Sequence, residues 1–95
     1  MKIVGRQQLL DFTKNHADAR SWIATWIAVV EAAEWKTSQD IKNLYRSASF
    51  LADNAVVFNV KGNRYRLEVQ VAYGQGTVSV KFAGTHAEYT RRLGR

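Results

Sequence analysis

Residues 56–73 read V-V-F-N-V-K-G-N-R-Y-R-L-E-V-Q-V-A-Y, and this stretch decides the expected fold. Apolar side chains occupy every second position of 56–60 and again of 65–73. A period of two is typical of strands with one buried face. Gly62-Asn63 separates the two runs and favours a two-residue hairpin turn. The stretch therefore predicts two neighbouring antiparallel strands.

A third strand is expected over residues 78–83, where apolar and polar residues alternate again. Gly74-Gln75-Gly76 precedes it, with Gln75-Gly76 as the expected loop. Gly84-Thr85 ends the strand. Thr85 and Glu88 have the spacing of a capping box, which predicts a short C-terminal helix.

The turns fix a predicted register for this sheet. The first turn pairs Phe58 with Leu67, Asn59 with Arg66 and Lys61 with Arg64. The second turn places Val71 opposite Val80, Gln70 opposite Lys81 and Arg66 opposite Thr85. One face then carries the apolar set Val56, Phe58, Val60, Tyr65, Leu67, Val69, Val71, Val78, Val80 and Phe82. The other carries Asn59, Lys61, Arg64, Arg66, Gln70, Ser79 and Lys81, with Glu68 as the acidic member.

The part of the chain before residue 50 is expected to be mainly helical. Residues 2–4 resemble a short edge strand, and residues 9–12 fall in a first helix. From Ala17 to Ala33, large apolar residues recur every three to four positions, which predicts a helix lying against the sheet. Ser38 is the expected cap of a third helix, with a stripe formed by Ile41, Leu44, Tyr45 and Ala48. The expected class is α+β, in one domain over residues 1–95.

Positive charge is concentrated in the second part of the chain. The net charge is +6. Residues 1–55 carry 7 Lys or Arg and 6 Asp or Glu, whereas residues 56–95 carry 7 and 2. Such asymmetry points to nucleic acid, an acidic protein or an anionic membrane as partner, although a soluble surface also needs charge.

Several chemistries are excluded or disfavoured by composition. The chain has no cysteine, so disulfides, thiolate metal sites and cysteine nucleophiles are excluded. Two distant histidines and scattered carboxylates give no metal-ligand spacing, and no cofactor is expected. No apolar run approaches a transmembrane length, and the start lacks a signal-peptide pattern, so a cytoplasmic location is expected.

Four residues form the predicted catalytic constellation: Arg66, Lys81, His86 and Tyr89. The register places Arg66 beside the start of the last helix, where backbone N–H groups favour an anion. His86 and Tyr89 are three residues apart and share a helix face. The four side chains are predicted to surround one phosphate. The alternative is a merely solvated sheet face, with Tyr89 in the core and His86 on the surface.

Asn59, Lys61 and Arg64 are the predicted RNA-binding residues on the same face. For Lys61 and Arg64, a simple charged hairpin tip explains the pattern equally well. His16 is expected to be a surface residue. The three tryptophans, Trp22, Trp26 and Trp35, are expected to be core or partner-facing groups rather than base-stacking platforms.

Residues 57–67, V-F-N-V-K-G-N-R-Y-R-L, and 80–89, V-K-F-A-G-T-H-A-E-Y, resemble two signatures of the HigB-type toxins of bacterial toxin–antitoxin systems. The resemblance implies a RelE-like fold, with N-terminal helices packed on one face of a small antiparallel sheet. It also implies an mRNA interferase that cuts mRNA, typically on the ribosome. Lys61, Arg66, Lys81, His86 and Tyr89 fall on motif positions.

The resemblance further implies a HigA-type helix-turn-helix antitoxin as partner, with operator DNA bound only through the antitoxin complex. No membrane partner is implied. The expected reaction is metal-independent attack of the RNA 2′-OH on the neighbouring phosphate. Two other function classes stay open on sequence grounds. One is a nucleic-acid-binding module without catalysis, and the other is a domain whose basic face docks an acidic protein.

Overall fold

The computed structural model describes residues 1–94, and its elements follow the expected order of a short strand, helices, a run of strands and a C-terminal helix. Strand β1 (Lys2–Val4) leads into helix α1 (Arg6–Asn15), the short 3-10 turn η1 (Ala17–Ala19) and helix α2 (Arg20–Ala32). Helix α3 (Ser38–Leu44), strand β2 (Ser49–Phe50) and turn η2 (Ala52–Asn54) follow. The chain then forms β3 (Ala55–Val60), β4 (Tyr65–Ala72), turn η3 (Tyr73–Gln75), β5 (Thr77–Thr85) and helix α4 (His86–Leu93). The class is α+β, as expected.

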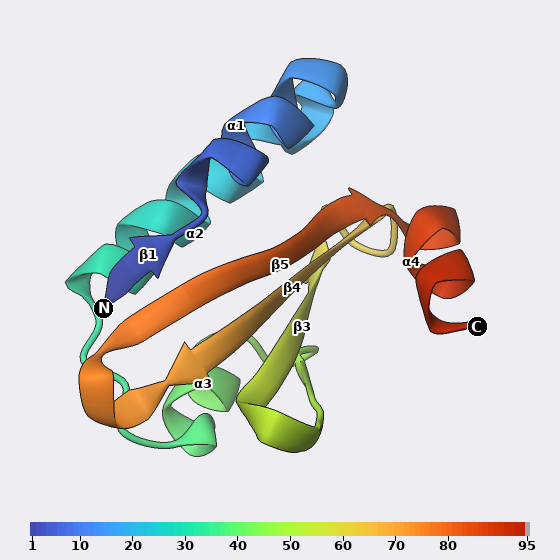
Figure 1. Cartoon of the computed structure of the whole chain (residues 1–95). Helices are drawn as coiled ribbons and strands as arrows, with labels where there is room; N and C mark the ends of the chain where they lie inside the picture. Colours follow the sequence, from blue (N-terminus) through green and yellow to red (C-terminus); the bar gives the residue numbers. More distant parts are fainter. Residues whose placement is uncertain (95) are drawn as a thin grey trace.

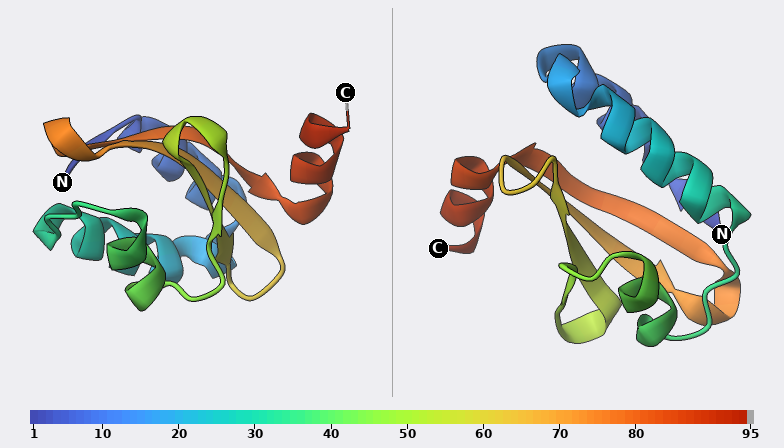
Figure 2. Two further views of the ribbon diagram at one scale, coloured as in Figure 1. Left: turned by 90° about the horizontal axis from the view of Figure 1, so that it is seen from below. Right: turned by 180° about the vertical axis from the view of Figure 1, so that it is seen from behind.

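One mixed sheet of five strands, in the order β1-β5-β4-β3-β2, organises the molecule. β1 pairs parallel to β5 at one edge, and the other neighbours are antiparallel. Helices α2 and α3 lie on one side of the sheet, and α1 runs alongside α2 (Figures 1 and 2). We call the side that packs on these helices the inner face and the opposite side the outer face.

The core lies between α2 and the inner face. Trp26 is fully buried, and its ring packs edge-on against Phe58, with ring centroids 5.6 Å apart. Val30 and Leu67 are also fully buried. Alternate residues of β3 and β4 enter this core, as the period of two predicts. This packing confirms that the helix after Ala17 covers the sheet.

The first hairpin has the predicted register. Phe58 pairs with Leu67, and Asn59 pairs with Arg66. The strands end earlier than expected, at Val60 and Tyr65, so Lys61 is not a strand residue. The φ angle of Lys61 is 55°, a left-handed conformation that turns the chain away from the sheet.

The second hairpin differs from the prediction. The connection spans residues 73–76 rather than Gln75-Gly76 alone, because Tyr73–Gln75 form a 3-10 turn. Val71 therefore pairs with Val78 instead of Val80, and Gln70 pairs with Ser79 instead of Lys81. The register then shifts once more. Val69 pairs with Val80 and Glu68 with Phe82, which leaves Lys81 as the extra residue of a β-bulge.

The bulge reverses which side chains face outward beyond it. Phe82 pairs with the outer-face residue Glu68, so the prediction that Phe82 faces the core is wrong. Arg66 pairs with Gly84 rather than Thr85. One inserted residue exchanges the inner and outer faces for every strand residue beyond it. An alternating sequence pattern alone does not reveal where such an insertion lies.

Helix α3 also begins and ends differently. Thr37, not Ser38, is its N-cap, and Asp40 completes a capping box with Thr37. The helix ends at Leu44, so Tyr45 and Ala48 lie beyond it. Leu44 is 58% exposed and does not join the expected apolar stripe.

Candidate functional site

Helix α4 begins at the end of β5, close to the β3–β4 hairpin (Figure 1). Thr85 Oγ1 accepts a hydrogen bond from the Glu88 N–H at 3.0 Å, and Glu88 Oε1 accepts one from the Thr85 N–H at 2.8 Å. This capping box confirms the predicted start of the helix. The N–H of His86 also donates to the Arg64 carbonyl at 3.0 Å, which ties α4 to the hairpin.

Gly84 permits the close approach of α4 and Phe82. A Cβ atom at this position would lie 2.8 Å from Phe82 Cζ and 2.6 Å from Glu88 Oε1. Both distances are shorter than ordinary contacts, so a side chain would displace the ring or the capping carboxylate. The absence of a side chain at Gly84 therefore lets the outer face fold against the helix.

Four side chains meet where α4 covers the outer face, and Arg66 lies near enough to affect the pKa of one of them, Tyr89. We call these five residues the α4 cluster: Arg66, Glu68, Phe82, Tyr89 and Arg92. The rings of Phe82 and Tyr89 are 5.8 Å apart. The Arg92 guanidinium lies over the Phe82 ring at 5.3 Å, and its Nε is 3.5 Å from a Glu68 carboxylate oxygen. The α4 cluster therefore combines two aromatic rings, Phe82 and Tyr89, with two arginines and one carboxylate.

Tyr89 is the most buried polar member of the α4 cluster. Its side chain is 8% exposed. Burial raises the pKa of the Tyr89 phenol, the Glu68 carboxylate raises it further, and Arg92 and Arg66 oppose the shift. The phenol thus stays protonated at neutral pH and can donate a hydrogen bond.

Arg66 is half-buried, and its guanidinium Nη1 donates to the Tyr65 carbonyl at 3.1 Å. Within residues 1–94, the ion pairs closer than 4.0 Å join Arg6 to Glu31, Arg64 to Asp18 and Arg92 to Glu68. Arg66 is in none of them. A cation without a carboxylate partner in the described chain retains the capacity to bind an external anion.

Lys81 and His86 are both exposed but lie apart. They are five residues apart along the chain, mostly within β5, so their Cα atoms are separated by roughly 15 Å. His86 is two residues beyond Gly84, the partner of Arg66. Arg66 and the start of α4, the helix that carries His86 and Tyr89, therefore lie at one end of β5, whereas Lys81 does not join them around a single phosphate.

Lys81 instead borders a shallow outer-face depression of about 380 Å³ with Glu68, Gln70 and Arg92. Leu51, Ala52, Asp53 and Ala55 line the rest of it. The depression is continuous with the α4 cluster, because Glu68 and Arg92 belong to both. Lys81 thus extends the cationic surface along the outer face.

The three predicted RNA-binding residues have different surroundings. Asn59 lies beside Arg66, and its side-chain amide donates to the Ser47 carbonyl at 3.4 Å. Arg64 forms an ion pair with Asp18 at 2.6 Å yet remains 67% exposed. Lys61 borders a cavity on the α2 side of the hairpin. The structure does not place these three residues on one common face.

The expectation that His16 is a plain surface residue is wrong. Its side chain is half-buried, and its ring centroid is 4.9 Å from those of both Phe12 and Tyr65. The pKa of the Glu88 carboxyl is lowered mainly by the hydrogen bond from the Thr85 N–H, and His16 lies close enough to contribute to this lowering. Packing between α1 and β4 gives His16 an environment that no sequence pattern indicated.

Sequence reasoning also missed Arg92 and the role of Phe82. The signal for Arg92 was its spacing: it follows Tyr89 by three residues, so both side chains share one face of α4. The bulge at Lys81, which turns Phe82 outward, had no signal in the alternation. Within residues 1–94, no three His, Asp or Glu side chains gather so that they could hold a metal ion.

The architecture, an α+β fold with helices on the inner face of a five-stranded mixed sheet, is consistent with a RelE-like fold. The chain belongs to the HigB toxin family, described as the RelE-like toxic component of a toxin–antitoxin system. The family model matches residues 19–92 of the 95-residue chain. This confirms the resemblance found in its two motifs.

The chain is therefore the toxin of a toxin–antitoxin system, and its family implies an antitoxin partner. No curated protein matches the chain. Within residues 1–94, every helix is too short or too polar to cross a bilayer.

Proposed function

We propose that this toxin is an endoribonuclease that cuts mRNA on the translating ribosome at the α4 cluster. The observation that carries the proposal is Arg66, a half-buried guanidinium with no carboxylate partner among residues 1–94, beside Tyr89 and the first residue of α4. Such a cation suits the charge that develops on a phosphoryl oxygen during RNA cleavage.

The proposed reaction uses groups of this chain and of the RNA. A base removes the 2′-OH proton, and the 2′ oxygen attacks the adjacent phosphorus. The bond to the 5′ oxygen then breaks, an acid protonates the leaving oxygen, and a 2′,3′-cyclic phosphate remains. His86 serves as acid or base, since imidazoles exchange protons near neutral pH. Arg66 stabilises the phosphoryl charge.

Tyr89 and Lys81 have supporting roles in this proposal. The raised pKa of Tyr89 keeps its hydroxyl available as a donor to the reacting phosphate. Lys81, roughly 15 Å along β5 from His86, binds a neighbouring backbone phosphate. Asn59, Lys61 and Arg64 extend backbone binding around the hairpin. The toxin works in the cytoplasm, and a HigA-type helix-turn-helix antitoxin neutralises it.

The test replaces Arg66 and His86 separately with alanine and maps the 5′ ends of cellular mRNA after brief induction. We expect each variant to lose cleavage by about 100-fold or more, because each removes charge stabilisation or proton transfer in the transition state. Lys14→Ala, an exposed cation in the last turn of α1, is the control and should retain activity. A Tm close to that of wild type shows that the variants are folded.

Full toxicity and unchanged 5′ ends in both variants would reject this site. If the wild-type protein binds RNA with strongly salt-dependent affinity but creates no new 5′ ends, the same surface is a non-catalytic nucleic-acid-binding module.

A further inference from the structure

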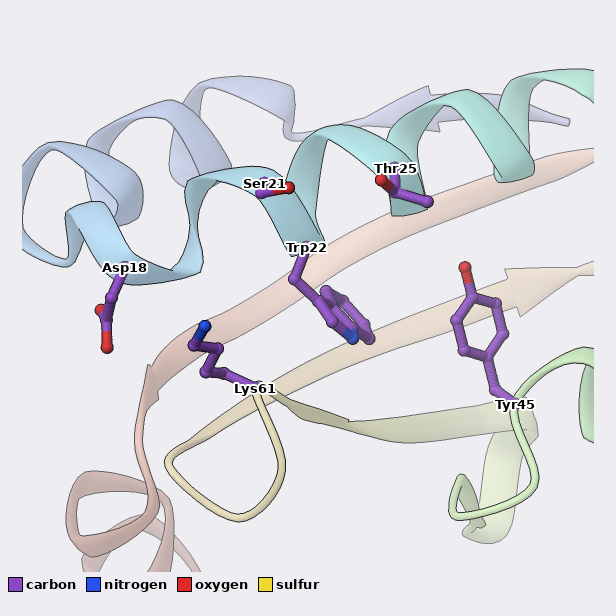
Figure 3. A pocket seen from close by; sticks show the side chains of 6 residues that line it. All are labelled: Asp18, Ser21, Trp22, Thr25, Tyr45 and Lys61. Carbon is purple, nitrogen blue, oxygen red and sulfur yellow. The ribbon is translucent and has the colours of Figure 1, made fainter.

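A cavity of about 330 Å³ lies on the inner side of the β3–β4 hairpin, opposite the outer face that carries the α4 cluster. Figure 3 shows its six lining side chains, which come from η1, α2, the segment after α3 and the hairpin tip: Asp18, Ser21, Trp22, Thr25, Tyr45 and Lys61. Ser21, Thr25 and Lys61 are exposed, so the cavity opens to solvent. Its volume suits a small planar ligand.

Two aromatic rings form the apolar part of this cavity. The ring centroids of Trp22 and Tyr45 are 5.9 Å apart, with an angle of 51° between the planes. Trp26 and Trp35 are 0% and 4% exposed and serve the core, one of the two roles expected for the tryptophans. Trp22 differs, because it is only half-buried and borders open space. Partly exposed aromatic rings are groups against which unpaired RNA bases pack.

Polar groups surround the aromatic pair. Ser21 and Thr25 are four residues apart on α2 and present their hydroxyls on one helix face. Asp18 accepts hydrogen bonds from the Tyr65 hydroxyl at 2.5 Å and from Arg64 at 2.6 Å. Each carboxylate oxygen can accept a second bond, so Asp18 remains an acceptor for a donor in the cavity.

Lys61 supplies the positive charge at this cavity. Its side chain extends from the hairpin tip toward Asp18 and Trp22 (Figure 3). The left-handed backbone of Lys61 (φ 55°) takes the residue out of the strand and brings its side chain to the α2 side. A cation beside an aromatic platform matches the combination of phosphate and base in a nucleotide.

The hairpin connects this cavity to the α4 cluster. Arg64 contacts Asp18 on the cavity wall with its side chain, while its carbonyl accepts the His86 N–H at 3.0 Å. Arg66 Nη1 also lies 3.4 Å from the Asn63 carbonyl in the same turn. A single strand held at Arg66 can therefore pass the exposed Arg64 side chain and reach the cavity.

We propose that this cavity binds one unpaired nucleobase of the RNA, packed against Trp22 and Tyr45 and read by Asp18. The proposal rests on the proposed function, because it assigns base recognition to the same RNA substrate. Asp18 accepts hydrogen bonds and cannot donate them, and the hydrogen bond from Tyr65 lowers its pKa and keeps it ionised. Adenine, cytosine and guanine carry an exocyclic amino group that projects outward and can donate to this carboxylate. The single donor of uracil, N3–H, lies between two carbonyl oxygens that an ionised carboxylate repels, so the cavity disfavours uracil.

The test titrates the purified wild-type protein with 5′-AMP, 5′-CMP, 5′-GMP and 5′-UMP and follows the Trp22 indole N–H by two-dimensional NMR. Trp22→Phe assigns that signal. We expect it to shift with the first three nucleotides, with at least several-fold weaker binding of UMP. A Ser21→Leu/Thr25→Leu double variant fills the cavity and should weaken binding at least tenfold.

Ala24→Leu/Ala28→Leu is the matched control, since both alanines are exposed on α2, four residues apart and outside the cavity. It should bind as wild type does. Absence of any shift at millimolar nucleotide, or equal binding by the filled variant, overturns the proposal. Equal affinity for all four nucleotides overturns the role of Asp18.

The binding measurement does not depend on cleavage, so it remains decisive even if Arg66→Ala and His86→Ala leave toxicity intact. Conversely, a toxin that cuts RNA but shows no nucleotide-dependent shift has the proposed activity without this base site. In cells, the filled variant should continue to cut mRNA while the base composition around its 5′ ends changes.

Discussion

Gly84 shows how strongly one residue decides the geometry of the α4 cluster. It sits opposite Arg66, under the Phe82 ring and next to the capping carboxylate of Glu88. The motif that contains it identified the family but gave no physical reason for a glycine. The structure supplies that reason: the space for a Cβ atom is already occupied from two sides.

Gly84→Ala should therefore destabilise the protein by about 1–3 kcal/mol, a typical cost of adding a methyl group to a filled site. Urea unfolding measures the change. Gly74→Ala is the control, because nothing lies within 4 Å of its Cβ position and its backbone is not left-handed. Equal stability of the two variants would show that Phe82 and Glu88 move aside at little cost.

Arg66 and Lys81 illustrate the limits of reasoning from residue type. Both were predicted as phosphate-binding cations on the outer face, and both side chains are outside the core. Only Arg66 lies at the start of α4. Lys81 lies apart because five residues of mostly extended chain separate it from His86, a distance that residue type alone does not convey.

At the scale of elements, α4 depends on its first turn. It has eight residues, too few to be stable alone, so its capping box and its contact with Phe82 hold it in place. The same helix positions His86, Tyr89 and Arg92. The capping box was predictable from the sequence because it depends on residues only three positions apart.

Thr85→Ala should loosen α4, with a loss of about 1 kcal/mol in its local stability. Hydrogen exchange should become faster for the amides of α4 while those of β3 and β4 stay protected. Thr37→Ala is the matched control, since Thr37 holds the equivalent capping box of α3. If Thr85→Ala leaves exchange in α4 unchanged, contacts with the sheet alone fix the helix.

At the scale of the whole molecule, Asp18 joins segments far apart in the chain. It lies in η1, before α2, and binds Tyr65 and Arg64 of the hairpin more than 40 residues later. Those hydrogen bonds, with Tyr65 the larger cause, lower the pKa of the Asp18 carboxyl. Hydrogen bonds with backbone N–H groups likewise lower the pKa values of Asp40 and Glu88.

The protein should lose stability as acid protonates these three carboxyls. A carboxyl with a lowered folded-state pKa stabilises the fold above its unfolded pKa, near 4, and this contribution disappears as pH falls through the folded pKa. Asp18→Asn should therefore be less stable than wild type at neutral pH, and the difference should shrink below about pH 4. Thermal unfolding between neutral and acid pH measures it, and a difference independent of pH would assign the effect to packing.

The sequence by itself determined the α+β class, the first hairpin with its register, the helix over the sheet and the cap of α4. These features depend on alternation, helical periodicity and short-range spacing, which are properties of neighbouring residues. The two motifs also identified the family, which the match over residues 19–92 confirmed.

Only the tertiary structure decided the bulge at Lys81, the outward position of Phe82, the environment of His16 and the cavity beside Trp22. Each depends on where segments distant in sequence meet. An inserted strand residue changes the face of every residue beyond it, and a cavity exists only between elements that have already packed. Alternation in the sequence specifies the two faces of a strand. The position of the bulge, beyond which those faces exchange, depends on how the strand packs against the rest of the molecule.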